Sequence, residues 1–147
     1  MNELPDFQII DIFDQVKDEI DHYKEFSEEE LFGKGESAIR CQNYIDSFKI
    51  FSYINSMNPS NQLAGIYREI SKVFISIRES ETSQLNNRRI KDIISKTKLF
   101  HMKKMISSDK LSDIEMLIDR IYENSSLDDD TRKYYCDIKE YLLAFYQ

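Results

Sequence analysis

Apolar residues recur at helical spacing along most of the chain. The clearest case follows Ser60, where one face carries apolar residues at the i, i+3, i+4, i+7 positions of a helix. These residues are Leu63, Ile66, Tyr67, Ile70, Val73, Phe74 and Ile77. Arg68, Lys72 and Arg78 fall off this stripe. The pattern predicts a helix with one side in a core and the other side basic.

The same periodicity predicts helices in five further segments. They are Leu4 to Phe26, Ser37 to Met57, Ser83 to about His101, Ser107 to about Tyr122, and Thr131 to Tyr146. Ser27 and Glu30 match a capping box, but Gly33 and Gly35 follow so closely that we expect a linker at Glu28 to Glu36. Asn58 precedes a proline and is expected to end the second helix.

These helices predict an all-α fold, a compact bundle of five to six helices in a single domain of residues 1–147. Residues 1–36 would form an acidic N-terminal helix and linker, and residues 37–147 the bundle. Ten apolar residues are predicted to lie in the core. They are Leu63, Ile66, Ile70, Phe74, Ile90, Ile94, Leu117, Ile121, Ile138 and Leu142.

Composition agrees with helices, since 147 residues contain only three Gly and two Pro to supply turns. No apolar run is long enough to cross a bilayer, and the N-terminus lacks the pattern of a signal peptide. We therefore expect a cytoplasmic protein with no membrane contact. In that compartment Cys41 and Cys136 are expected to be reduced thiols without a functional role.

Charge is distributed unevenly along the chain. The net charge is -7, but residues 1–33 carry eleven acids and two basic residues, whereas residues 34–104 carry thirteen basic residues and six acids. A phosphate chain responds to the local field within a Debye length of about 8 to 10 Å. The middle of the chain can therefore face a polyanion although the whole protein is acidic.

Motifs for catalysis or for cofactors are missing from the sequence. Neither glycine-rich phosphate-binding pattern is present, so no cofactor is expected. His22 and His101 are predicted to be solvated or at the edge of the core, and no ligand spacing indicates a metal. The acidic runs Glu28 to Glu30 and Asp128 to Asp130 stand at helix starts, where negative charge is favourable. No catalytic residue is predicted.

From Ser60 onward the chain resembles the small subunit of type III-A (Csm-type) CRISPR effector complexes. Three motifs carry the resemblance: the helix start SNQLAGIY, the basic helix end KLFHMKK and the terminal EYLLAF. The chain has Ala64 where that family commonly has an arginine, and Met102-Lys103-Lys104 where it has a small-residue turn. Residues 1–59 do not share the resemblance.

This resemblance implies a non-catalytic scaffold that stacks along the guide and target RNA. Copies would self-associate along the filament, hold the RNA through its sugar-phosphate backbone, and contact other subunits of the effector complex. Backbone binding requires exposed Lys and Arg along a helical face. The predicted RNA-binding residues are Arg68, Lys72, Arg88, Arg89, Lys96, Lys98, Lys103 and Lys104.

An alternative interpretation starts from the acidic first helix. The chain would then be an acidic helical protein-interaction module, such as a phage inhibitor or regulator that mimics nucleic acid, and the basic helix would be a solvated face. Its working residues would be Asp11, Asp14, Asp18, Asp21 and Glu25.

Overall fold

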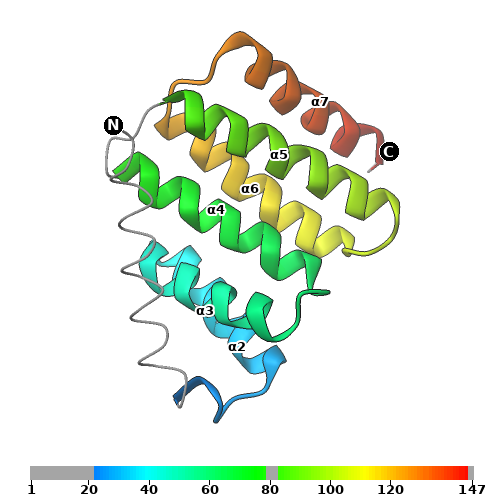
Figure 1. The fold of residues 1–147 in the computed structure, drawn as a ribbon. Helices are drawn as coiled ribbons and strands as arrows, with labels where there is room; N and C mark the ends of the chain where they lie inside the picture. The colour runs from blue at the N-terminus through cyan, green and yellow to red at the C-terminus, as the bar shows by residue number, and fades with distance from the viewer. Residues whose placement is uncertain (1–21, 79–82, 146–147) are drawn as a thin grey trace. The chain divides into compact units, whose positions relative to one another are not determined.

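The computed structural model describes residues 22–78 and 83–145 of the chain. In this part every regular element is an α-helix, which confirms the predicted all-α bundle of five to six helices. The helices are α2 (Glu28–Arg40), α3 (Tyr44–Met57), α4 (Gln62–Arg78), α5 (Ser83–Met102), α6 (Ser108–Asn124) and α7 (Asp129–Phe145) (Figure 1). The predicted helix at residues 4–26 lies outside the described residues except for its last five positions.

The chain divides into two compact units, residues 1–76 and residues 77–147. The first unit contains α2, α3 and nearly all of α4, and the second contains α5, α6 and α7. The single domain expected from the sequence stays a prediction. None of the described helices is both long and apolar enough to span a bilayer.

Helix α2 corrects the prediction of a linker at residues 28–36. The capping box is present as expected: the Glu30 backbone N–H donates to the Ser27 hydroxyl at 3.1 Å, and the Ser27 N–H donates to the Glu30 carboxylate at 2.8 Å. Hydrogen bonding by Ser27 lowers the pKa of Glu30. The helix then continues through both glycines, because Gly35 is buried where α2 approaches Phe51. The absence of a side chain permits this approach and does not break the helix.

The predicted helix from Ser37 to Met57 is wrong as a single element. It is divided by a turn at residues 41–43, where Gln42 adopts a positive φ of 67° that a helix does not allow. Cys41, the C-cap residue of α2, is exposed at this turn.

Helices α3 and α4 are joined by buried polar and aromatic contacts. The hydroxyl groups of Ser47 and Ser71 lie 2.7 Å apart and both are fully buried. Beside them, the rings of Tyr44 and Phe74 stack with centroids 4.3 Å apart. These contacts fix the buried side of α4 within the first unit.

Helix α5 runs alongside both α6 and α7 in the second unit (Figure 1). Helices α6 and α7 are linked by Lys139, which forms ion pairs with Glu115 and with Asp119. Asp119 also accepts a hydrogen bond of 2.6 Å from the Tyr135 hydroxyl, and the Tyr135 ring stacks on Tyr122 at 4.2 Å. Paired charges and stacked rings therefore hold the outer helices of this unit together.

Nine of the ten predicted core residues are buried, which confirms the apolar stripes. Leu63 is the exception, because it lies in the first turn of α4 and is only half-buried.

Candidate nucleic-acid interface

Helix α5 separates apolar and basic residues around its axis. Ile90, Ile93, Ile94 and Thr97 point into the second unit and are at most 2% exposed. At about 100° per residue, the opposite side of the helix carries exposed residues such as Arg88. The local sequence thus requires this basic side to face solvent once the isoleucines are buried.

The turn after α5 adds two lysines to its C-terminal end. Lys104 adopts a positive φ of 62°, so the chain leaves the helical path and the Met105 N–H donates back to the Phe100 carbonyl at 2.8 Å. The sequence predicted that this helix ends at about His101, and it ends at Met102. Lys103 and Lys104 are both exposed there.

Four of the predicted RNA-binding residues are accessible on this surface. Arg88, Lys103 and Lys104 are exposed and make no ion pair within the described residues. Lys96 pairs with Asp92 at 3.0 Å, but both side chains are at least half exposed. Exposed pairs of this kind contribute only about 0 to 1 kcal/mol, so Lys96 can exchange its partner for a phosphate at little cost.

The flanks of α5 are more enclosed. Arg89 and Lys98 are half-buried, and the Lys98 ammonium lies 5.6 Å from the centre of the Tyr141 ring. Lys91 was not among the predicted site residues, and it donates to Asp130 at 2.8 Å; this hydrogen bond raises the pKa of the Lys91 amine. The positive charge of Lys91 is therefore already compensated by the carboxylate of Asp130.

Arg68 and Lys72 lie on α4 in the first unit, whereas the other six predicted residues lie in the second. The Arg68 side chain is 21% exposed; it donates to the Ser52 hydroxyl at 3.1 Å and pairs with Glu69 at 2.6 Å. Its guanidinium also lies 4.9 Å from the centre of the Phe48 ring. A phosphate would have to displace these contacts. RNA binding by these eight residues stays a prediction.

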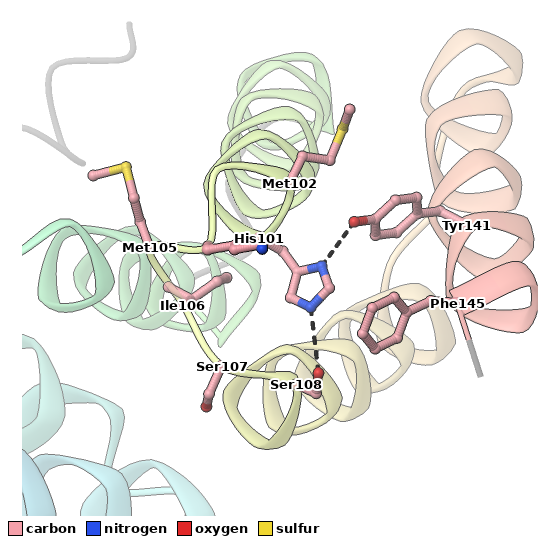
Figure 2. Close-up of a pocket in the computed structure, with 9 residues that line it drawn as sticks. His101, Met102, Met105, Ile106, Ser107, Ser108, Tyr141 and Phe145 are labelled. Carbon is pink, nitrogen blue, oxygen red and sulfur yellow. Dashed lines mark hydrogen bonds between the residues drawn. The ribbon is translucent and has the colours of Figure 1, made fainter.

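A pocket of about 630 Å³ at the end of α5 was not predicted from the sequence. Figure 2 shows the His101 ring facing two side chains of α7, Tyr141 and Phe145. The His101 Nδ1 atom lies 2.7 Å from the Tyr141 hydroxyl, and its Nε2 atom lies 3.4 Å from the Ser108 hydroxyl. His101 is 8% exposed, which agrees with a place at the edge of the core. Met102, Met105 and Lys104 also line the pocket.

The acidic runs lie at the starts of α2 and α7, as the sequence indicated. At the start of α7, Asp128 accepts the Thr131 N–H at 2.8 Å, and Asp129 pairs with Arg132 at 2.6 Å. Within residues 22–78 and 83–145, no cluster of His, Cys, Asp and Glu side chains could hold a metal ion. The exposed side of α5 presents positive charge.

Comparisons of the chain with models of known protein families, with curated proteins and with solved structures found no match. The resemblance to the CRISPR small subunit therefore rests on the three sequence motifs alone.

Proposed function

We propose that the chain is a non-catalytic, cytoplasmic subunit that binds an RNA backbone through α5 and the turn that follows it. The observation that carries the proposal is the basic side of α5, where Arg88, Lys96, Lys103 and Lys104 are accessible and Asp92 is the single acid. At a rise of 1.5 Å per residue, Arg88 and Lys103 lie about 22 Å apart along the helix direction. This length spans several phosphates of one strand.

The proposed role is that of the small subunit in a type III-A CRISPR ribonucleoprotein, which the sequence motifs imply. Such a subunit would stack in copies along paired guide and target RNA and contact other effector subunits. Backbone recognition suits this role because it is indifferent to base sequence. Exposed basic side chains along α5 and in the turn after it support this kind of contact.

The test measures binding of a fluorescein-labelled 20-base-pair RNA duplex between 50 and 300 mM salt. We expect two duplexes of unrelated sequence to bind equally and affinity to fall steeply with salt, because each phosphate contact releases condensed counterions. Changing Lys96, Lys103 and Lys104 together to Gln should reduce the slope of log K against log salt by about 2 to 3.

The matched control changes Lys34, Arg40 and Lys133 to Gln, which removes the same charge at exposed positions elsewhere. Equal loss in both triple variants would mean that only net charge matters and would refute the proposed surface. Measuring how the chain and its variants bind to a reconstituted type III-A effector, instead of to free RNA, tests the assignment to that complex. A different result would be that reversing the charges of Asp11, Asp14 and Asp18 abolishes binding to a protein partner while the triple lysine variant behaves like the parent. The RNA-binding proposal would then be wrong, and the acidic protein-interaction module would replace it.

A further inference from the structure

The pocket at the end of α5 combines an apolar rim with positive charge. Met102, Met105 and Phe145 line it and remain 60%, 50% and 47% exposed. Exposed apolar side chains gathered around one recess are characteristic of a binding surface. Methionine side chains are flexible and can adapt to the shape of an entering group.

The polar groups in the pocket wall are already engaged with one another. Both nitrogens of the His101 ring face hydroxyl groups, those of Tyr141 and Ser108 (Figure 2). Ser107 acts as the N-cap of α6, and its hydroxyl accepts the Lys110 N–H at 3.2 Å. Few hydrogen-bonding groups remain to read a nucleobase or a polar metabolite. The recess is therefore suited to a large apolar side chain.

Positive charge surrounds this recess. Lys104 is the one charged side chain among its described lining residues, which include no carboxylate. Lys103 is exposed beside it in the sequence, and the Lys98 ammonium lies against the Tyr141 ring that forms part of the wall. A ligand with an apolar centre and negatively charged flanks would complement this arrangement.

We infer that the pocket binds an acidic amphipathic helix of a protein partner, which inserts one large apolar side chain between Met102, Met105 and Phe145 and directs carboxylates to Lys98, Lys103 and Lys104. This is the helix-in-groove mode of recognition, in which an apolar anchor gives affinity and charge gives orientation. The inference goes beyond RNA binding and does not depend on it, because the anchor contacts are apolar.

The test uses the full chain labelled with ¹³C at its methionine methyl groups. The probe is a synthetic 15-residue helical peptide with one central Phe flanked by Glu one helical turn away on each side. We expect the Met102 and Met105 methyl signals to move on titration, whereas those of Met57 and Met116 stay in place. These two are matched controls, because they are 66% and 61% exposed but lie outside the pocket.

Two variants measure the contributions of the anchor and of the rim. Met105→Glu should weaken peptide binding at least tenfold, as expected for the loss of an anchor contact, and Lys104→Glu several-fold with a smaller salt dependence. Met116→Glu and Lys133→Glu should leave affinity unchanged. Both main variants are at exposed positions, so they test binding and not folding.

Three results would overturn the inference. The first is a peptide with Ala in place of Phe that binds as well as the original. The second is equal movement of all four methionine signals, or of none. The third is movement of the Met102 and Met105 signals by a 12-nucleotide oligouridine and not by the peptide, which would assign the pocket to RNA.

Discussion

Replacing Gly35 by Ala should test the packing of α2 against α3. A Cβ atom at residue 35 would lie 2.7 Å from Cζ and 2.8 Å from Cε2 of the Phe51 ring, closer than carbon atoms pack. The Phe51 ring is fully buried and stacks on Tyr67 at 5.1 Å, so it cannot move aside without disturbing a second ring. Gly33, in the same helix, is exposed, and a Cβ there would meet nothing within 4 Å.

Substitution by alanine is therefore expected to change the free energy of unfolding in opposite directions at Gly33 and at Gly35. Alanine in a helix interior is favoured over glycine by about 1 kcal/mol, and this gain applies to both positions. Adding a methyl group to a packed core costs about 1 to 3 kcal/mol, and this cost applies to Gly35 alone. We expect Gly33→Ala to raise the free energy of unfolding by about 1 kcal/mol, and Gly35→Ala to lower it by up to about 2 kcal/mol.

Urea unfolding followed by circular dichroism measures both variants against the parent. The difference between the variants should be about 1 to 3 kcal/mol, because their helix propensities cancel. Equal stabilisation of both would show that Gly35 does not meet the Phe51 ring, and that the described packing of α2 on α3 is wrong.

Two further predictions concern one residue of each unit. Ile70→Asp should lower the free energy of unfolding by about 3 to 5 kcal/mol, because Ile70 is fully buried and the new side chain would be an unpaired buried charge. This is a large part of a total stability of about 5 to 15 kcal/mol, so a urea transition close to that of the parent would contradict the core assignment. Burial and the hydrogen bond to Asp119 raise the pKa of Tyr135 to about 12. Since the unfolded tyrosine titrates near pH 10, the stability due to this proton is complete below pH 10 and is lost as pH rises toward 12. Tyr135→Phe should flatten this part of the stability profile, and an unchanged profile would argue against the raised pKa.

Hydrophobic periodicity predicted most of the fold because each helix buries a continuous stripe. It failed between residues 28 and 43, where two local rules misled. Glycine usually interrupts helices, but at Gly35 the missing side chain is what a neighbouring helix requires. Gln42 gives no sequence signal for its positive φ, so the turn that divides α2 from α3 is visible only in the structure. Tertiary packing decided the first of these points.

The basic side of α5 could be predicted for a similar reason. Lysines that alternate with buried isoleucines must face outward in whichever bundle forms. The pocket could not be predicted, because His101 and Ser108 are separated from Tyr141 by at least 33 positions and no helical period connects them. Its only local signal was Met102 and Met105, two large apolar residues among lysines at a helix end. The engagement of Arg68 by Ser52 likewise depends on which helices pack together.

An acidic protein can present a positive surface if its acids are paired elsewhere. In the second unit, Glu115 and Asp119 share Lys139, and Asp130 pairs with Lys91. The Lys91–Asp130 pair cancels within a few ångströms, so its field beyond a Debye length of about 8 to 10 Å is small, and Lys139 offsets one of the two charges of Glu115 and Asp119. Lys103 and Lys104 have no such partner in the part of the chain that is described, and they project from the end of α5. The local potential at this end is therefore set by unpaired lysines and not by the net charge of -7. An RNA backbone and an acidic helix would both be attracted to these lysines, and the apolar contacts of Met102, Met105 and Phe145 distinguish the two ligands. A change at Met105 that weakens peptide binding but preserves the salt-dependent affinity for RNA would separate the two ligands on one surface.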